Sequence, residues 1–481
     1  MFDNTRAQYD RVLVEIADYV IAYSEISDLA YETARYCLMD SMGCGILALN
    51  YPECAKLLGP WVPESNAIQT GVSIPGTNFE LDPIKAAFDI TACIRWLDYN
   101  DTWLAAEWGH PSDNLGAILA CADYMNQKLI GKKQPAITMQ IVLEAMIKAY
   151  EIQGILALQN SFNQVGLDHV ILVKVASVAV ATKLLGGTRQ HIIDALSQAW
   201  VDGQSLRTYR HAPNTCSRKS WAAADATSRA VRLALLTLQG EKGCPSALTA
   251  SKWGFSDVLF NREEVEFAQP LKCYVMENIL FKVAYPAEFH GQTAVECAFK
   301  LHHEIEEYLD DIDNIEQIII ETQKPAMRII NKTGELRNYA DRDHCIQYMT
   351  AVALLTGEIT SDSYLDEMAN DPRIDQLRHK MQVKENIEFS KDYLDPKKRS
   401  IGNQVQVKLT NGEIYKETVE FPIGHPRRRE EAKPLLWDKF RNNLTSVYSD
   451  EQVAKIESIF RQPENLERLT VAEFLNLFKK N

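Results

Sequence analysis

Residues 98–114, DYNDTWLAAEWGHPSDN, combine carboxylate, hydroxyl and imidazole side chains at a spacing that suits proton transfer. Asp98 and His110 are residue types that serve as general acid or base, and the Thr102 hydroxyl could orient either of them. A buried carboxylate costs free energy unless it is paired or used. The segment is therefore either a catalytic group or a structural one. In the structural interpretation, Asp98 and Thr102 brace neighbouring backbone and His110 is an ordinary loop histidine, and the residues alone favour this interpretation because single Asp/His pairs are common.

Residues 203–224, GQSLRTYRHAPNTCSRKSWAAA, contain no Asp or Glu, although the chain as a whole is acidic. The stretch carries four candidate substrate-binding cations, which are Arg207, Arg210, Arg218 and Lys219. Fixed guanidinium and ammonium groups suit a ligand with several carboxylates or phosphates. A solvated loop that pairs with an acidic surface explains the same composition, and the pattern alone leaves the two interpretations even.

Two more ionisable residues lie in apolar surroundings. His169 precedes the run VILVKVASVAVATKL, where a core histidine bonded to backbone is the simpler interpretation and a catalytic histidine the other. Lys282, in ENILFKVAYPAEFH, lies at an expected domain boundary, where ligand pockets are common. Because lysines are rarely buried without a partner, Lys282 is expected at a cleft or in an ion pair. The basic segments RDHC (342–345) and GHPRRR (424–429) are further candidates, the second more simply explained as surface charge.

Local patterns predict the elements that position these residues. Asp82 can cap a helix that begins at Pro83, and residues at helical spacing from Ile84 to Arg95 form one face of this helix. The same periodicity continues to Asp98, which is therefore expected to point inward. Ser112 is a candidate N-cap of the next helix, and helix N-termini attract anions such as a substrate carboxylate.

The spacing of apolar residues predicts a mainly α fold, with a large all-helical domain and an inserted smaller α+β domain. We expect the helical domain at 1–275, the α+β domain at 276–429 and a C-terminal return to the helical domain at 430–481. IEQIIIETQ predicts a strand, and NQVQVKLTNGEIYKETVEF predicts a hairpin with a type I′ turn at Asn411-Gly412.

The composition excludes several classes of protein. The chain has 481 residues and a net charge of −14, so it can form a large core but lacks the extended basic face that nucleic acids or anionic membranes require. The first residues do not resemble a secretory signal, and no apolar run is long enough to span a bilayer. The ten cysteines include no C-x-x-C pair, which predicts free thiols in a reducing compartment. A cytoplasmic protein is expected.

Five segments together resemble the MmgE/PrpD family: DYNDTWLAAEWGHPSDNLGAILA, GLDHVILVKVASVAVA, LRTYRHAPNTCSRKSWAAADATSRAVRLAL, YVMENILFKVAYPAEFHGQTAVE and YADRDHCIQYM. The resemblance covers nearly the whole chain and includes FPIGHPRRR. It implies a helical domain with a smaller lid domain, usually in a homodimer, and no iron–sulfur cluster. We therefore expect no cofactor and no metal ion.

The resemblance also implies a reaction. In the dehydratase branch, water is eliminated from 2-methylcitrate to give 2-methyl-cis-aconitate, in the methylcitrate route of propionate breakdown. Citrate and cis-aconitate are further candidate substrates. A sister branch decarboxylates cis-aconitate to itaconate, and a non-catalytic tricarboxylate-binding protein is the alternative from a different class.

The active-site positions of the decarboxylase branch can be matched one at a time to this sequence. The matching residues are Asp98, Thr102, His110, His169, Lys219 and Lys282. Two positions differ, because Glu288 stands where that branch has a histidine and Arg328 stands near the position of its lid tyrosine. These differences favour the dehydratase branch.

Elimination of water removes a proton α to a carboxylate while hydroxide leaves the neighbouring carbon. Because the developing aci-carboxylate adds charge to a trianion, positioned cations must stabilise it. The candidate cations are Arg207, Arg210, Arg218, Lys219 and Lys282. His110, His169 and Asp98 are candidates for general base and general acid. In our working hypothesis His110 transfers a proton, Asp98 orients it or acts as base, and Thr102 holds the Asp98 side chain. Without a metal ion, a side chain must protonate the leaving hydroxyl.

Overall fold

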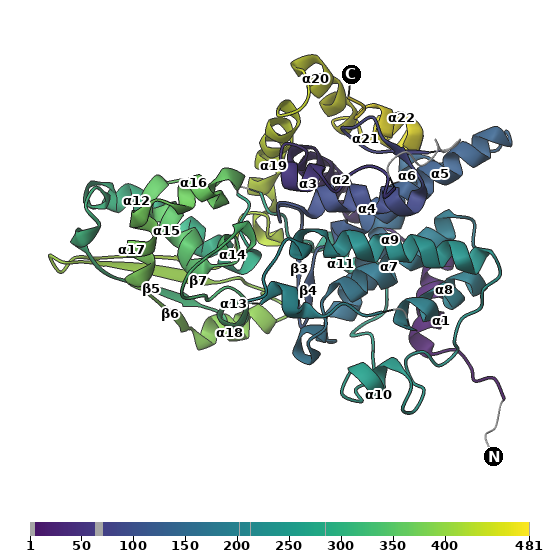
Figure 1. The fold of residues 1–481 in the computed structure, drawn as a ribbon, viewed down its shortest axis with the longest axis horizontal. Coiled ribbons are helices and arrows are strands. Elements are labelled where there is room, and N and C mark those ends of the chain that lie inside the picture. The colour runs from purple at the N-terminus through teal and green to yellow at the C-terminus, as the bar shows by residue number, and fades with distance from the viewer. Residues whose placement is uncertain (1–4, 63–70, 202, 212, 284, 481) are drawn as a thin grey trace.

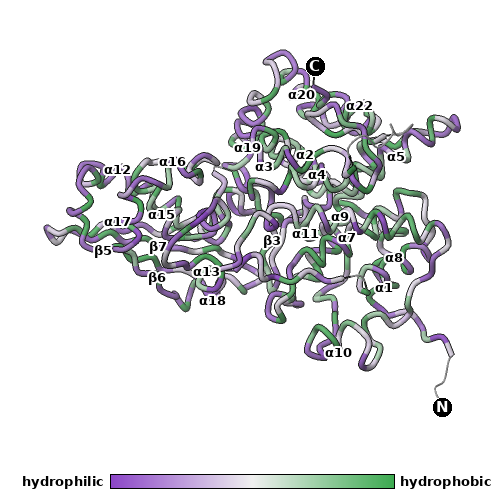
Figure 2. Tube along the Cα trace, viewed as in Figure 1, coloured by the Kyte–Doolittle hydropathy of each residue, from purple (hydrophilic) through white to green (hydrophobic). Residues whose placement is uncertain are grey.

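The computed structural model describes residues 5–62, 71–201, 203–211, 213–283 and 285–480. It is mainly helical, as predicted, and its largest sheet has four strands. In Figure 1 the elements around this sheet lie to one side of the molecule, and the remaining helices lie to the other. Hydrophobic and hydrophilic residues alternate along most elements (Figure 2), as expected for helices and strands with one face in a core. Within the described residues, no helix has the length and apolar character needed to cross a bilayer.

The first core is built by helices from the N-terminal part of the chain. These are α1 (Arg11–Ala22), α2 (Asp28–Ala48), α3 (Pro52–Ala55), α4 (Pro83–Arg95), α5 (Leu115–Gly131), α6 (Met139–Ala157), α7 (Val170–Leu184), α8 (Arg189–Val201), α9 (Arg218–Leu238), α10 (Phe255–Leu259) and α11 (Tyr274–Glu277). Helix α7 is buried on all sides apart from Lys183, and it packs against α6, α8 and α9. It is therefore the central helix of this core.

Short elements connect these helices. They are the strand pairs β1 (Val72–Ser73) with β2 (Glu80–Leu81) and β3 (Trp103–Leu104) with β4 (Trp108–Gly109), and the 3₁₀ turns η1 (Pro111–Asn114), η2 (Phe162–Val165) and η3 (Arg207–Arg210). Helix α4 packs closely against α9. This pairing brings the segment that follows α4 next to the start of α9, and thus brings the two predicted parts of the site together.

The sheet region has a core of its own. Its strands are β5 (Ile315–Thr322), β6 (Met381–Glu385), β7 (Asn403–Leu409) and β8 (Ile414–Val419), in the order β6-β5-β7-β8. Strands β5 and β6 are parallel, and the other pairs are antiparallel. Ile318 pairs with Val407 and Ile320 with Val405, and all four side chains are fully buried. The strand predicted from IEQIIIETQ is therefore confirmed as β5.

Helices surround this sheet. They are α12 (Gln292–Leu309), α13 (Lys324–Ile329), α14 (Tyr339–Arg342), α15 (Ile346–Thr356), α16 (Asp366–Ala369), α17 (Pro372–His379) and α18 (Ile387–Leu394), with the 3₁₀ turns η4 (Phe289–Gly291), η5 (Ile312–Asn314) and η6 (Ser361–Tyr364). Helix α12 contacts β7, β8 and α15. The chain then turns through η7 (Pro426–Arg428).

The last helices return to the first core. They are α19 (Arg429–Thr445), α20 (Asp450–Phe460), α21 (Pro463–Arg468) and α22 (Val471–Asn476). Apolar residues from Ala432 to Phe478 share one cluster with residues of the N-terminal helices. In Figure 1 these yellow helices lie beside α2, α5 and α6.

Two local predictions about turns and helix ends are wrong in detail. The Asn411-Gly412 hairpin exists, but of this pair only Gly412 has a positive φ (94°), and its N–H donates to the Leu409 carbonyl at 3.0 Å. A type I′ turn needs positive φ at both central residues, so the turn is of another type. The predicted start of α4 is correct, because the Asp82 carboxylate accepts from the Ile84 and Lys85 N–H groups at 2.9 and 3.0 Å. The predicted continuation of α4 past Arg95 is wrong, because the helix ends at that residue.

Candidate active site

Asp98 lies just after α4 rather than on it. The helix ends at Arg95, and Asp98 adopts a left-handed backbone conformation with φ of 52°, which is uncommon for a residue other than glycine. The side chain is nevertheless buried, with 3% of its surface exposed. The inward orientation predicted for Asp98 is therefore correct, but a tight turn produces it in place of helical periodicity. Such strain is typical of residues that a functional site holds in place.

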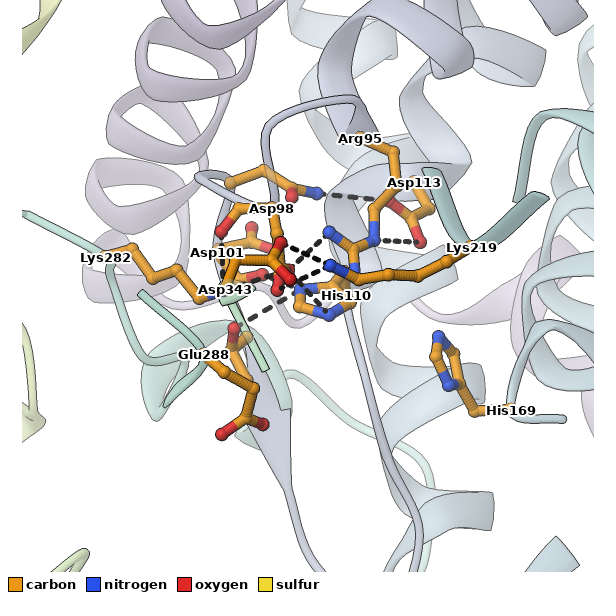
Figure 3. Close-up of polar contacts among 12 residues, drawn as sticks. Arg95, Asp98, Asp101, His110, Asp113, His169, Lys219, Lys282, Glu288 and Asp343 are labelled. Atoms are coloured by element: carbon orange, nitrogen blue, oxygen red, sulfur yellow. Dashed lines mark hydrogen bonds and ion pairs between the residues drawn. The ribbon is translucent and has the colours of Figure 1, made fainter. Parts of the chain in front are cut away.

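Three cations surround the Asp98 carboxylate (Figure 3). Lys282 Nζ lies 2.9 Å from Asp98 Oδ1 and also donates to the Asp98 carbonyl at 2.6 Å. The Arg95 guanidinium donates to the same carboxylate, and Lys219 Nζ lies 3.8 Å from Oδ2. Burial opposes ionisation of Asp98, but Arg95, Lys282 and Lys219 hold the pKa of its carboxyl well below its usual range. Asp98 is therefore an anion and a poor proton acceptor.

Lys219 joins Asp98 to a second carboxylate. Its ammonium group donates to Asp343, and the other oxygen of Asp343 lies 2.9 Å from His344 Nδ1. Burial lowers the pKa of Lys219, an effect that Asp343 and Asp98 oppose. Neither Asp343 nor Arg95 was predicted as a site residue. The RDHC segment was noted only as basic, and Arg95 only as part of a helix face. We call Arg95, Asp98, His110, Lys219, Lys282 and Asp343 the Asp98 cluster.

His110 faces Asp98 with one ring nitrogen and the backbone with the other. Nδ1 lies 2.7 Å from the Asp101 carbonyl, which can only accept, so Nδ1 carries the proton. In the neutral ring Nε2 then has a free lone pair, and it lies 3.5 Å from Asp98 Oδ1. Burial and the nearby Arg95 hold the pKa of His110 well below its ordinary value of 6.5. His110 is therefore neutral at neutral pH and can accept a proton at Nε2.

Thr102 has a different partner from the one predicted. Its hydroxyl oxygen lies 3.3 Å from His110 Nδ1, so it helps to orient the imidazole and does not hold the Asp98 side chain. The Thr102 backbone exchanges two hydrogen bonds with Leu280, at 2.8 and 3.0 Å. This bridge connects the turn that carries Thr102 to the segment that carries Lys282.

Buried carboxylates hold the loop around His110. Asp101 accepts hydrogen bonds from the Ser112 N–H at 3.1 Å and the Ser112 hydroxyl at 2.8 Å, and Asp113 accepts from the Asn100 amide at 3.1 Å. Burial raises the pKa of Asp101 to about 6 and that of Asp113 to about 7. Ser112 lies inside η1 and not at the N-cap of α5, so that prediction is wrong.

The backbone of Lys282 is held by the C-terminal helices. Lys439, on α19, donates to the carbonyls of Lys282 at 2.6 Å and Tyr99 at 2.7 Å, and it lies 2.6 Å from Asp40 on α2. Lys439 is 5% exposed and Asp40 1%. This buried pair fixes the main chain on both sides of the Asp98 cluster, because Tyr99 directly follows Asp98.

Arg207 and Arg210, from η3, surround a different aspartate. Arg210 binds Asp168 through two hydrogen bonds, and Arg207 Nη1 lies 3.4 Å from the same carboxylate. Burial opposes the ionisation of Asp168, but Arg210, His169 and Arg207 hold its pKa well below its usual range. We call Asp168, His169, Arg207 and Arg210 the Asp168 cluster. Both predicted cations are buried here, but their guanidinium groups are already occupied.

His169 connects the two clusters. Its ring centroid lies 5.9 Å from that of His110, and its Nδ1 lies 3.5 Å from Asp168 Oδ1. Among the described residues neither ring nitrogen has a hydrogen-bond partner, although the residue is only 2% exposed. Figure 3 shows its ring apart from the dashed contacts of the Asp98 cluster. The interpretation as a core histidine bonded to backbone is therefore wrong, and a buried imidazole that makes no hydrogen bond can offer its ring nitrogens to a ligand.

Arg218 is not brought into either cluster. Its side chain is 35% exposed, it pairs with Asp225 at 3.1 Å, and its guanidinium stacks on Trp221 at 4.4 Å from the ring centroid. The two positions that depart from the decarboxylase pattern are also occupied: Glu288 accepts from His290 at 2.8 Å, and Arg328 donates to Asn163 at 2.9 Å.

One group of described residues has the geometry to hold a metal ion. Ligand atoms of Asp98, Asp343 and His344 lie within 4.8 Å of one another. However, Lys219 already pairs with both carboxylates, and Lys282 pairs with Asp98. A divalent cation at this place would be repelled by these ammonium groups, so the donor set does not fit a metal. The absence of a metal stays a prediction.

The Asp98 cluster can perform acid–base chemistry on an anionic ligand. It contains a neutral imidazole with a free lone pair, and two buried lysines whose pKa burial lowers. The lysines and Arg95 can exchange the Asp98 and Asp343 carboxylates for those of a ligand. These groups suit a polycarboxylate whose carboxylates bind the cations and whose C–H group gives a proton to His110.

Comparison with known proteins also indicates an enzyme, and the relatives are named for a polycarboxylate substrate. The MmgE/PrpD N-terminal domain matches residues 14–268, and the MmgE/PrpD C-terminal domain matches residues 285–464. Proteins named 2-methylcitrate dehydratase are 54% identical in Escherichia coli K12, over 99% of both chains, and 56% identical in Cupriavidus necator, over 98% of both. A mitochondrial 2-methylcitrate dehydratase from Yarrowia lipolytica is 53% identical over the whole of this chain and 92% of its own. The chain belongs to the MmgE/PrpD family.

Proposed function

We propose that this protein is a hydro-lyase that eliminates water from 2-methylcitrate to give 2-methyl-cis-aconitate, within the methylcitrate route of propionate catabolism. The observation that carries the proposal is the neutral His110, whose free Nε2 lies 3.5 Å from the cation-surrounded Asp98. Relatives that match this chain almost end to end, at 54–56% identity, carry the name of that activity. The class of enzyme is a hydro-lyase.

His110 acts as the general base. A useful base must be unprotonated at the working pH and yet bind a proton in the transition state. The pKa of Asp98 is held too low for this by Arg95, Lys282 and Lys219, whereas His110 offers a lone pair at Nε2. Thr102 and the Asp101 carbonyl keep the ring in the required tautomer. His110 Nε2 therefore takes the proton from the carbon α to a substrate carboxylate.

Lys219 protonates the leaving hydroxyl. The electrons of the broken C–H bond form the alkene, and the C–O bond breaks toward oxygen, which needs a proton to leave as water. Lys282 is held by both the carboxylate and the carbonyl of Asp98. Lys219 is bound by carboxylates alone, which a substrate carboxylate can replace, and burial lowers its pKa. Arg95 and Lys282 stabilise the charge on the aci-carboxylate.

The Asp168 cluster positions the substrate and does not transfer protons. Arg207 and Arg210 were predicted to bind substrate directly, but their pairing with Asp168 supports a role in fixing His169. The ring nitrogens of His169, which make no hydrogen bond to any described residue, are then available to hydrogen-bond a substrate carboxylate or hydroxyl. Arg218 has no place in this scheme.

The arrangement of the chain supports a lid. Asp98 and Lys219 come from 1–275, and Lys282 and Asp343 come from 276–429, so the cluster is complete only when the two regions meet. We propose that 276–429 is an inserted lid domain, that 430–481 completes the helical domain, and that the protein is a homodimer located in the cytoplasm and active without a metal ion or other cofactor.

One assay separates the candidate activities. Purified protein is mixed in turn with 2-methylcitrate, citrate and cis-aconitate, while alkene absorbance and carbon dioxide are recorded. We expect alkene from 2-methylcitrate, slower reaction of citrate, and no carbon dioxide from cis-aconitate. A single methyl group discriminates by about 10- to 200-fold. Release of carbon dioxide would identify the decarboxylase alternative, and tight binding without turnover would identify a non-catalytic tricarboxylate-binding protein.

A further inference from the structure

A cavity lies outside the Asp98 cluster, where the loops that follow α18 and precede α19 meet β3 and α11. Its volume is about 170 Å³. Since a water molecule takes up about 30 Å³ in the liquid, the space suits a compact ligand of several heavy atoms. Trp103, Tyr274 and Tyr393 form much of its aromatic wall.

The described residues that line this cavity include four cations and no carboxylate. The cations are Lys397, Lys398, Arg399 and Arg427. Carboxylates in the neighbouring turn serve other purposes, since Asp392 pairs with Lys398 at 2.7 Å and Asp395 accepts from the Lys397 N–H at 2.9 Å. Within the part of the chain that the structure describes, Arg399 and Arg427 have no ion pair. In a chain with a net charge of −14, such a local excess of positive charge requires an explanation.

Arg399 is held in a costly arrangement. Its backbone φ is 44°, in the left-handed region that non-glycine residues rarely adopt. Its guanidinium lies 5.0 Å from the ring centroid of Trp103 and 5.5 Å from that of Tyr274. Its Nε is buried and has no hydrogen-bond partner among the described residues. A buried donor without a partner costs free energy, which a hydrogen bond to a ligand oxygen would offset.

Arg427 and His425 join the two loops into one wall. Arg427 donates to the Lys397 carbonyl at 2.8 Å and lies 4.5 Å from the ring centroid of Phe421. His425 accepts from the Arg427 N–H at 3.2 Å. Burial lowers the pKa of His425 to about 4, so the ring is neutral at neutral pH and adds no charge. The cations are therefore arranged before any ligand arrives, which reduces the entropy cost of binding.

We propose that this cavity is a second anion site, which binds a compact oxyanion with carboxylate or phosphate groups between Arg399 and Arg427. Planar guanidinium groups are well suited to such oxygens. The site is separate from the catalytic one, because none of the Asp98 cluster lines it.

The position of the cavity also makes the bound anion an effector of catalysis. Leu280 lines the cavity and is itself one partner of the backbone bridge to Thr102, and Trp103, which also lines the cavity, directly follows Thr102. This bridge holds the Thr102 hydroxyl against His110 and is two residues from Lys282. A ligand that orders the bridge therefore changes the alignment of His110 and of Lys282. This consequence rests on the proposed function, whereas the binding does not.

Calorimetric titration of the full chain tests the binding, with inorganic phosphate and succinate as separate probes. The active site also attracts anions, so Lys219→Met is titrated beside wild type. We expect saturable binding of at least one probe that Lys219→Met retains and that Arg399→Met and Arg427→Met each weaken at least ten-fold. Lys391→Met, which removes an exposed cation paired with Glu388 near the same helix end, should leave it unchanged. The tighter probe identifies the oxyanion as phosphate or carboxylate.

No saturable binding, or binding that Lys219→Met removes and Arg427→Met retains, overturns the second site. The effector role is tested by the rate of alkene formation with and without the tighter probe. We expect at least a two-fold change in wild type and none in Arg427→Met. An equal response of both proteins contradicts the effector role. Because the titrations need no turnover, failure of the proposed function leaves the result on binding intact.

Discussion

The Asp98 and Asp168 clusters are built on the same plan from different cations. Each has a buried aspartate whose pKa neighbouring cations hold low, and each has a histidine within 3.5 Å of that aspartate. Around Asp98 two of the cations are lysines, whose pKa burial lowers, whereas around Asp168 the cations are arginines, which stay charged. The difference separates a site whose cations can exchange protons from one whose cations keep their charge.

Lys219→Met should have the largest effect on turnover among the cations. We expect kcat to fall about 10³-fold, because the leaving hydroxyl loses its proton donor and the aci-carboxylate loses a cation. Lys219→Arg keeps the charge but yields no proton, so it should stay nearly as slow. Steady-state rates of alkene formation decide between the roles, since recovery in Lys219→Arg would show that Lys219 acts by charge alone.

Arg210→Met should instead affect stability. Asp168 would remain buried with Arg207 as its one remaining arginine, and breaking a buried pair in this way costs about 3 kcal/mol of unfolding free energy. Urea unfolding measures the loss. The matched control is Arg189→Met, which removes an exposed pair with Asp18 and should cost less than about 1 kcal/mol. Equal losses would mean that the Asp168 cluster is not a structural centre.

The pH dependence of kcat/KM should be bell-shaped. The pKa of His110 is lowered, so its neutral, active form persists below pH 6.5, and the acidic limb should lie there. The pKa of Lys219 is also lowered, so as the pH rises its ammonium loses the proton, and the alkaline limb appears, at a pH below the ordinary lysine value of 10.5. Asp343 opposes that lowering, and Asp343→Asn should therefore move the alkaline limb to lower pH. A limb that does not move excludes Lys219 as the titrating group.

Arg218→Ala should have the smallest effect. Its guanidinium is partly exposed and pairs with Asp225, and such pairs contribute little. We expect kcat/KM to change by less than about five-fold. A loss comparable with that of Lys219→Met would show that Arg218 binds substrate, as the sequence predicted, and that it does not differ in role from Lys219.

The sequence predicted four residues of the Asp98 cluster but not the contacts between them. Asp98 and Lys282 stood out because charged groups in apolar surroundings call for a partner, Lys219 because its loop has no acidic residue, and His110 because it precedes a predicted helix N-terminus. Asp343 did not, because its partner Lys219 is 124 positions away along the chain and no local pattern reports such a pairing.

Periodicity failed where the backbone is strained. The pattern through Arg95 predicted a longer helix, but helical spacing contains no signal for the positive φ at Asp98. It also could not show that Arg207 and Arg210 belong to Asp168, since a basic loop has the same composition whether it binds ligand or another part of the chain. By contrast, strand β5 followed from its β-branched residues alone.

The most direct measurement of the central claim is the rate of alkene formation from 2-methylcitrate by His110→Ala. If His110 Nε2 takes the α-proton, the rate should fall about 10²- to 10⁴-fold while the unfolding free energy stays close to that of wild type. His302→Ala, which removes a histidine of α12 bonded to the Leu354 carbonyl, is the control and should keep its rate. Turnover by His110→Ala at the wild-type rate would contradict the account.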